Sequence, residues 1–360
     1  MDAHRSLVDG LSHILNKRLI WLLVGSYVAA GLCPSFGIWM RNVSFGEATV
    51  LTGVRVSLPM LMLALLLFNA GLGVQVHQLR SLLRKPLVLI LGLLANSIVP
   101  VVFTFGVGVM ARSWHNSDEK ESILVGLALV AAMPVAGSST AWSQNANGNL
   151  ALSLGMVLFS TLFSPWTTPL ALHSISLMTT GGFATALHEL AFSTVLPFLL
   201  LCVLLPVVLG VVAQHALGQV RIASTKHLLK IANSAILLLL NYSNASVSLP
   251  SSVADPDWDF LALTMGIVVS LCAFSFSAGW WLARCLRLDT AERVALAFGL
   301  GMNNNGTGLV LASLVFADYP RVMLPIIFYN LIQHLAAGVV DRLLSDSESN
   351  PARALTATGA

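Results

Sequence analysis

The sequence predicts an all-α membrane protein with ten transmembrane helices, arranged as two inverted repeats of five helices each. Three observations lead to this prediction. Apolar runs of roughly 20 residues, the length that crosses the hydrocarbon of a bilayer, recur along the whole chain. Only 10% of the 360 residues are charged and 56% are hydrophobic, whereas soluble domains are roughly 25% charged. Two of the runs, each the fourth of its half, are interrupted by glycine and polar residues.

The ten expected spans follow the apolar runs in order: residues 19–39, 56–75, 87–111, 122–146, 150–174, 190–214, 227–248, 259–283, 291–317 and 322–342. They form one transporter domain over residues 19–342, with repeat one at 19–174 and repeat two at 190–342. An odd number of spans in each repeat turns one repeat upside down relative to the other. Interrupted helices at matching positions in such repeats meet near the middle of the membrane.

The basic residues predict the orientation of the chain. With the N-terminus inside, five of the 19 Lys and Arg residues fall in outer loops, and the other fourteen fall inside. The outer residues are Arg41, Arg55, Arg112, Lys120 and Arg321. This bias supports an even number of spans, with both termini in the cytoplasm.

The two ends of the chain are expected to lie outside the bilayer. Residues 1–18 lack the features of a cleaved signal peptide, so we expect a cytoplasmic N-terminal segment. Residues 343–360 are expected to form a cytoplasmic tail that is disordered. The location that we predict for the whole protein is the inner (cytoplasmic) membrane of a bacterium.

The interruptions are the candidate binding region. Span four is broken at Pro134 and Gly137, and span nine is broken around Gly301 and Gly306. Backbone groups freed at bilayer depth must be satisfied inside the protein or line a cavity. The polar candidates for binding a substrate or an ion are Ser138, Ser139, Thr140, Ser153, Asn303, Asn304, Asn305 and Thr307. The alternative is that the interruptions only kink the helices and that the amides join neighbouring helices.

Other polar residues at depth carry weaker signals. Asn96 and Ser97, before Pro100, are interpreted as packing or kink partners. His334 is the one titratable side chain in the middle of a span, and it could carry a proton or form an interhelical hydrogen bond. No Asp or Glu lies mid-span, although carboxylates are the usual ion and proton sites of transporters.

Several classes of function find no support in the sequence. There is no HExxH motif, no Walker motif and no cooperating Ser/His/Asp set, so neither an enzyme nor an ATP-driven pump is indicated. The net charge of +3 is small and the basic residues are scattered, which excludes nucleic acid as a partner. The expected partners are the lipid bilayer and a small solute.

Three stretches of the chain resemble the bile acid:sodium symporter family. Met133–Ser139 (MPVAGSS) is similar to the Ala-Pro-Gly-Gly-Thr-Ala-Ser entry of the family's broken helix four. Gly148–Ser153 and Ser160–Pro169 are similar to its helix five, and Gly301–Asn304 is similar to the Gly-Met-Gln-Asn of broken helix nine. The helix-five pattern is the most specific of these.

This resemblance implies a core of spans three to five and eight to ten, which moves against a panel of the other four spans. Broken helices four and nine cross in the core. Two sodium ions bind at the crossing, and an organic anion binds beside it, towards the panel. The resemblance also adds Gly299 and Met302 to the candidate site, and it implies no cofactor other than sodium.

The chain departs from the family where the ions should bind. The family's glutamate, which touches both ions, is Gly299 here. Four further positions also differ, with Asn303 for glutamine, Thr140 for asparagine, Val157 for threonine and Ala95 for glutamine, while Ser139 and Ser153 are kept. Losing the carboxylate should weaken sodium binding, because an opposite charge offsets the dehydration of the ion.

We therefore predict a secondary-type transporter that moves an organic anion or another small solute by alternating access, with weakened or absent sodium coupling. One alternative is a carrier of another inverted-repeat family, such as an arsenite or auxin-type permease, but the helix-five pattern argues against it. The other is a membrane sensor that kept the fold and does not transport. The sequence determines neither the substrate nor the oligomeric state.

Overall fold

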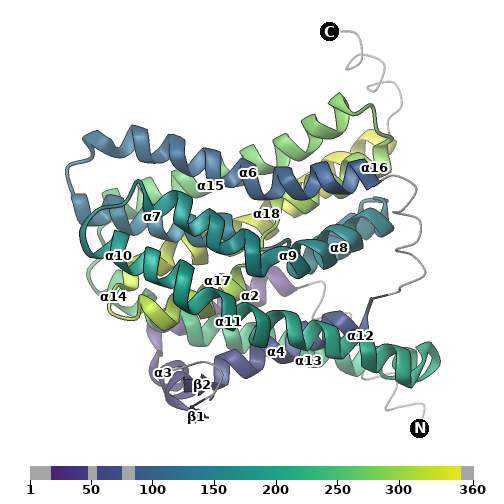
Figure 1. The fold of residues 1–360 in the computed structure, drawn as a ribbon, viewed down its shortest axis with the longest axis horizontal. Helices are drawn as coiled ribbons and strands as arrows, with labels where there is room; N and C mark the ends of the chain where they lie inside the picture. The colour runs from purple at the N-terminus through teal and green to yellow at the C-terminus, as the bar shows by residue number, and fades with distance from the viewer. Residues whose placement is uncertain (1–17, 48–54, 75–85, 350–360) are drawn as a thin grey trace.

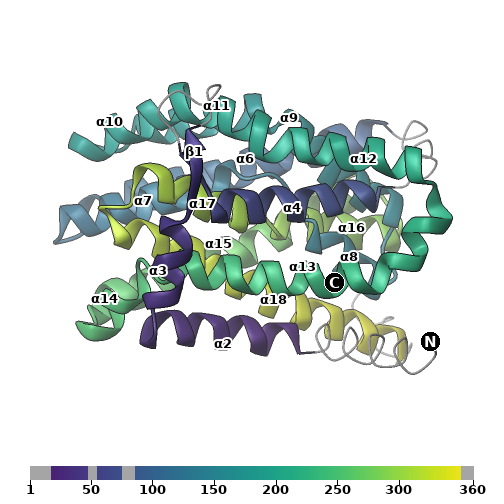
Figure 2. The ribbon, with the colours of Figure 1, turned by 90° about the horizontal axis from the view of Figure 1, so that it is seen from below.

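The structure is a computed structural model, and it describes residues 18–47, 55–74 and 86–349. Most of its helices run roughly along the long axis of the molecule (Figures 1 and 2). The helices, in order, are α2 (Leu19–Leu32), α3 (Ser35–Asn42), α4 (Leu58–Leu72), α6 (Pro86–Met110), α7 (Ser117–Ala132), α8 (Ser138–Asn145), α9 (Leu150–Ser176), α10 (Gly181–Glu189), α11 (Val195–Phe198), α12 (Leu205–Leu217), α13 (Gln219–Ala245), α14 (Leu249–Ala254), α15 (Trp258–Cys285), α16 (Thr290–Gly301), α17 (Asn305–Val315) and α18 (Met323–Ser349).

The protein is an all-α membrane protein, apart from one small hairpin. Strands β1 (Ser44–Glu47) and β2 (Arg55–Ser57) pair antiparallel between α3 and α4. Helices α10, α11 and α12 form one long apolar segment, because two π-helical stretches, Leu190–Thr194 and Leu199–Leu204, join them without a break. The segment therefore begins earlier than the expected span at 190–214.

Five helices among the described residues are long and apolar enough to cross a membrane: Pro86–Ser113, Leu150–Ser176, Gly181–Leu217, Trp258–Cys285 and Pro320–Leu344. A sixth is present if α2 and α3, which are bent by 91°, count as one span. The other expected spans coincide with α4, α13 and the pairs α7–α8 and α16–α17. These helices are individually shorter or more polar, because interruptions or polar residues divide their apolar runs.

The ends of the chain differ in part from expectation. Helix α18 continues to Ser349, past the boundary expected at residue 342, so the first residues of the expected tail are helical. The rest of that tail and nearly all of the expected N-terminal segment lie outside the described residues.

The helices pack as two groups. One group contains α6, α7, α8, α9, α15, α16, α17 and α18, and the other contains α2, α4, α12 and α13. In the second group, α4 and α12 approach closely at Gly71 and Gly210. A Cβ atom on Gly71 would lie 2.3 Å from the carbonyl oxygen of Val207. Small residues at such interfaces are typical of helix pairs in membranes, because they let the backbones meet.

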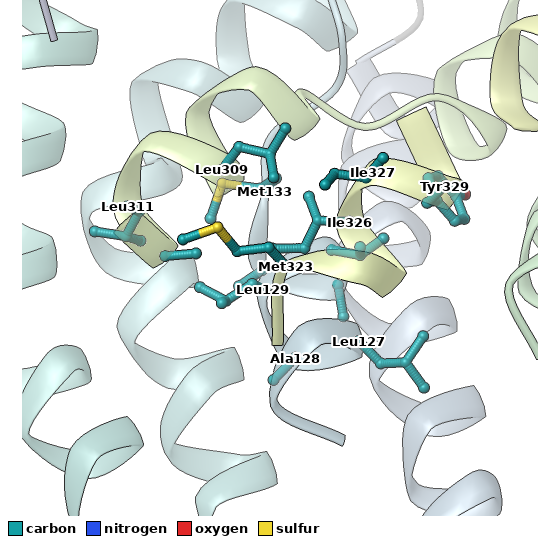
Figure 3. Close-up of a cluster of buried hydrophobic side chains, with 14 of the residues drawn as sticks. Leu127, Ala128, Leu129, Met133, Leu309, Leu311, Met323, Ile326, Ile327 and Tyr329 are labelled. Atoms are coloured by element: carbon teal, nitrogen blue, oxygen red, sulfur yellow. The ribbon is translucent and has the colours of Figure 1, made fainter. Parts of the chain in front are cut away.

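Helix α7 lies at the centre of the first group. Every residue from Ser122 to Ala132 is buried, so this helix has no lipid-facing stripe. Figure 3 shows the apolar cluster at its end, where α7, α17 and α18 meet. Leu129 and Met133 approach Leu309 from α17 and Met323 and Ile326 from α18 (Figure 3). This packing holds the interruption after α7 beside the start of α17.

Candidate functional site

Each of two helix pairs is interrupted at the residues that the sequence singled out. Helix α7 ends at Ala132 and α8 begins at Ser138, so Pro134 and Gly137 lie between them. Helix α16 ends at Gly301 and α17 begins at Asn305, with Gly306 in the first turn of α17. Proline lacks an N–H group and breaks the ladder of helical hydrogen bonds, which accounts locally for the first interruption.

The two interruptions pair with each other. The N–H of Ala136 donates to the carbonyl oxygen of Met302 at 2.9 Å, and the N–H of Asn304 donates to the carbonyl oxygen of Pro134 at 2.8 Å. Val135 and Asn303 thereby form an antiparallel bridge. The backbone groups that the interruptions free are thus satisfied inside the protein, as a hydrocarbon environment requires. We call this paired region, Met133–Gly137 with Met302–Asn304, the crossing.

Two helices start at the crossing. The side chain of Asn304 caps α17 by accepting from the N–H of Thr307 at 3.3 Å. Helix α8 begins after Gly137 and has no side-chain cap. Helix N-termini carry unpaired N–H groups and a partial positive charge. The crossing therefore presents positive potential without a basic side chain.

A buried amide network supports the second interruption. Gln333 of α18 accepts through Oε1 from the N–H of Asn303 at 3.0 Å and from Nδ2 of Asn305 at 3.1 Å. Nδ2 of Asn303 donates to the carbonyl oxygen of Val130 at 3.0 Å. These bonds hold both asparagines in one orientation. Gln333 was not among the predicted binding residues.

The same network reaches the other group of helices. Nε2 of Gln333 donates to Oδ1 of Asn330 at 3.3 Å. Nδ2 of Asn330 donates to the hydroxyl of Tyr27 in α2 at 2.7 Å and to Oδ1 of Asn241 in α13 at 3.1 Å. The sequence did not indicate these pairings, since Tyr27 and Asn241 lie 303 and 89 residues from Asn330 in the chain. The only available signal was the spacing of Asn330 and Gln333, which places them on one face of a helix.

Two cavities border the crossing. The first, of about 360 Å³, is lined by Gly137, Ser138 and Asn303–Gly306 together with residues from α4, α13 and α18. The second, of about 290 Å³, is lined by Val135, Gly137, Thr140 and Asn304 together with residues from α4, α9 and α12. Their described linings contain amides, hydroxyls and apolar side chains but no Asp, Glu, Lys or Arg. Cavities of this size, between two groups of helices, suit a small molecule.

The predicted binding residues divide into two sets. Those that line a cavity are Ser138, Thr140, Asn303, Asn304 and Asn305. Those that line neither cavity are Ser139, Ser153, Gly299, Met302 and Thr307, and all five are buried. Ser153 supports the site indirectly, because its hydroxyl donates to Oγ1 of Thr140 at 3.3 Å.

Gly299 is enclosed by a neighbouring side chain. A Cβ atom placed on Gly299 would lie 2.7 Å from both Sδ and Cε of Met156 in α9. Met156 itself is fully buried. The space that a longer side chain at position 299 would enter is therefore filled by an uncharged thioether. The sequence comparison with the family did not indicate Met156.

Four buried oxygens near the crossing have no hydrogen-bond partner among the described residues: Ser139 Oγ, Asn303 Oδ1, Asn305 Oδ1 and Thr307 Oγ1. Buried oxygens are normally paired, so these four each require a partner such as a water molecule or an ion. Neutral oxygens can ligate a cation, although none of these four supplies a negative charge. The set is compatible with sodium held weakly.

His334 lines the first cavity and is tied to Trp142 of α8. The indole Nε1 donates to Nδ1 of His334 at 3.4 Å. Since an indole N–H can only donate, Nδ1 must be unprotonated, and the ring proton of a neutral imidazole then sits on Nε2. Nδ1, the nitrogen that would accept a carried proton, thus already accepts a hydrogen bond from Trp142. The geometry favours the interhelical hydrogen bond that the sequence left as an alternative.

A separate polar cluster lies at the ends of the helices. The ligand atoms of His115, Glu119 and Asp259 lie within 4.8 Å of one another. Arg321 occupies the same place, with Nη1 3.4 Å from Oε1 of Glu119 and Nη2 3.1 Å from Oδ2 of Asp257. The guanidinium pairs with two of the carboxylates, and Nε2 of His115 lies 3.4 Å from Oδ2 of Asp259. We therefore interpret the cluster as an ion-pair network that links the start of α7, the start of α15 and the segment before α18, rather than as a metal site.

The fold and the crossing define a class of protein. Two interrupted helices that meet beside polar cavities, within a helical membrane protein, are typical of transporters. The sodium bile acid symporter family matches residues 60–253. The chain belongs to this family, and it is a transporter rather than an enzyme.

Three relatives show how far the similarity extends. YocS of Bacillus subtilis (strain 168), described as an uncharacterized sodium-dependent transporter, is 25% identical over 313 residues, covering 85% of this chain and 89% of that protein. The uncharacterized protein YbaS of the same organism is 26% identical over 293 residues, covering 80% and 89%. The probable sodium/metabolite cotransporter BASS2 of Oryza sativa subsp. japonica is 23% identical over 307 residues, covering 85% and 64%. This membership does not support the arsenite or auxin-type alternative.

Proposed function

We propose that the protein moves a small organic solute, in the first instance an organic anion, across the inner (cytoplasmic) membrane by alternating access. The observation that carries this proposal is the pairing of the two interruptions between cavities. The cavities are lined by neutral amides and hydroxyls, and the N-termini of α8 and α17 start beside them. Helix N-termini can bind an anionic group in the absence of Arg or Lys.

The proposed movement takes place between the two groups of helices. The group of α6–α9 and α15–α18 would move as a core against the panel of α2, α4, α12 and α13. The first cavity draws its lining from both groups, so relative movement would change its access. We propose ten spans in two inverted repeats, with both termini cytoplasmic, because the interrupted pairs α7–α8 and α16–α17 occupy matching positions and pair antiparallel.

We further propose that sodium coupling is weakened or absent. Two of the relatives carry names that describe sodium-dependent transport. In this chain, however, Met156 fills the space beside Gly299, and the unpaired oxygens at the crossing are all neutral. A neutral cage holds sodium less strongly, because no charge in the site compensates for the lost hydration.

The test begins with the purified protein in detergent. Its melting temperature is measured against sodium chloride, with choline chloride keeping the ionic strength constant. A ligand that binds only the folded protein raises the melting temperature by mass action. We expect a flat response, whereas a saturable, sodium-specific rise would contradict weakened coupling.

Uptake into proteoliposomes then tests transport itself. Organic anions that raise the melting temperature are used as labelled solutes, with and without a sodium gradient. We expect saturable uptake that does not depend on sodium. An anion that binds at the crossing but is never taken up would overturn the transporter proposal, and it would favour the sensor that kept the fold.

A further inference from the structure

A third cavity lies away from the proposed transport route. It has a volume of about 270 Å³ and lies between α6, the end of α7 and α9. It shares none of its lining residues with the two cavities at the crossing. Its innermost wall is Ala131–Pro134, the start of the first interruption. Nothing in the proposed transport mechanism makes use of this space.

The third cavity opens halfway along two membrane-spanning helices. Leu93–Ser97 lies in the middle of α6, and Ser160–Thr167 lies in the middle of α9. Both helices belong to segments long and apolar enough to cross the bilayer. At the rim, Ile90, Leu94 and Phe163 are 52%, 50% and 46% exposed. At this depth the exposed surface meets hydrocarbon, so a ligand would enter from the bilayer interior.

One polar atom in the third cavity lacks a partner. Asn96 is 4% exposed, and its Oδ1 accepts no hydrogen bond from any described residue. The hydroxyls of Ser97 and Thr167 donate to carbonyl oxygens of their own helices, Leu93 at 3.2 Å and Phe163 at 3.3 Å. An unpaired carbonyl oxygen at bilayer depth is costly. Asn96 is buried, as expected of a packing or kink partner, but its Oδ1 is left without a hydrogen bond.

The hydroxyl of Ser160, in the same wall of the cavity, makes two hydrogen bonds. It accepts from the N–H of Val135 at 3.0 Å and donates to the carbonyl oxygen of Val157 at 3.1 Å. Val135 in turn belongs to the crossing. Among the polar side-chain oxygens of the described lining, Oδ1 of Asn96 is thus the one that makes no hydrogen bond.

We propose that the third cavity binds a small molecule dissolved in the bilayer, with an aliphatic body and one hydroxyl group that donates to Oδ1 of Asn96. The remaining lining is mostly apolar, which suits an aliphatic body. A carboxylate would place a second acceptor against Oδ1, and an ammonium would lose its hydration for a single amide oxygen. The volume of about 270 Å³ lies just below the roughly 300–1,000 Å³ typical of ligand pockets, which suits a small ligand. The inference does not depend on the proposed function.

The experiment uses the full chain in lipid nanodiscs. The probe is a twelve-carbon alcohol that carries a diazirine in its chain, and labelled residues are located by mass spectrometry. We expect labelling at Leu94 and Phe163 that 1-decanol displaces about fivefold more effectively than methyl decyl ether does, as one hydrogen bond implies. Equal displacement by the alcohol and the ether would overturn the proposal.

Three variants complete the test. Asn96→Leu removes the acceptor and should abolish the preference for the alcohol, without lowering thermal stability, because no hydrogen bond of Oδ1 is lost. Leu94→Trp places a larger side chain at the rim and should reduce labelling of Phe163. Val102→Trp is the matched control, since Val102 is 57% exposed on the same helix and does not line the cavity. Even labelling along α6, or retained alcohol preference in Asn96→Leu, would overturn the proposal.

Discussion

Gly299 of α16 faces Met156 of α9 so closely that a Cβ atom on Gly299 would lie 2.7 Å from the methionine sulfur. The family resemblance places a carboxylate at position 299, and that carboxylate would need the space that Met156 now fills. A single substitution that restores the carboxylate must therefore displace the end of the Met156 side chain, and a smaller residue at position 156 removes that contact.

The first prediction concerns this pair. Gly299→Glu alone should destabilise the protein by about 3 kcal/mol or more, because it overpacks the site and buries an unpaired charge. Combined with Met156→Ala, it should make the melting temperature rise with sodium. At sodium concentrations of about 100 times the dissociation constant, the gain would approach roughly 2.7 kcal/mol.

The matched control for this pair is Gly299→Ala with Met156→Ala, which opens the same space without adding charge. We expect it to show no response to sodium. A response in the control, or none in the double variant that carries the glutamate, would show that position 299 does not contact the ion site.

The second prediction concerns Gln333. Gln333→Met keeps the length of the side chain but removes the acceptor of the Asn303 N–H, whose bond is 3.0 Å long. The substitution also removes the bonds of Gln333 to Asn305 and Asn330. Leaving even one buried donor unpaired costs about 1–3 kcal/mol, so thermal stability should fall. Leu335→Met on the same helix is the control, since Leu335 is 43% exposed. Equal effects of the two substitutions would contradict a structural role for the amide network.

The third prediction concerns the contact between α4 and α12. Gly71→Ala should lower stability by about 1–3 kcal/mol, because the new methyl group meets the backbone of Val207, which cannot move aside as a side chain would. Gly106→Ala in α6 is the control, since a Cβ atom added there would have no other atom within 4 Å. It should be neutral or stabilise by up to about 1 kcal/mol, as alanine favours helix. Thermal unfolding in detergent distinguishes the two.

The fourth prediction concerns the tautomer of His334. Nitrogen-15 NMR of labelled protein should show Nδ1 unprotonated and Nε2 protonated, because Trp142 donates to Nδ1. Trp142→Phe should remove the hydrogen bond to Nδ1 and give a mixture of tautomers. The His334→Gln variant, which lacks the imidazole, assigns the NMR signals of His334. A ring protonated on both nitrogens in the unmodified protein would mean that His334 can carry a proton after all.

Part of the site was predictable from the chain alone. Pro134 and Gly137 interrupt a helix for a local reason, and the Asn303–Asn305 run is conspicuous within an apolar span. Ser138, Thr140 and Asn303–Asn305 do line the two cavities at the crossing. Local signals of this kind act through backbone chemistry and composition, so they can be read without knowing which helices are neighbours.

Other parts could not be predicted in this way. Gly299 was singled out because the family has a glutamate at this position. The sequence did not indicate that Met156, from another helix, fills the space that a glutamate would need. Tyr27 and Asn241 meet Asn330 across α2, α13 and α18. Asn96 was interpreted as a packing or kink partner, and the sequence did not indicate that its Oδ1 is left unpaired. Such contacts depend on how each helix is rotated about its own axis, which hydropathy does not specify.

Hydropathy and local breakers were enough to show that this is a helical membrane protein and to locate the two interruptions. Hydrocarbon thickness sets the length of an apolar run, and proline and glycine act on their own turn of helix. The pairing of the interruptions through Pro134, Ala136, Met302 and Asn304, and the oxygens left unpaired, depend on how the helices pack together. Helices surrounded by lipid gain little from hiding an apolar face, so close packing and interhelical hydrogen bonds select their partners.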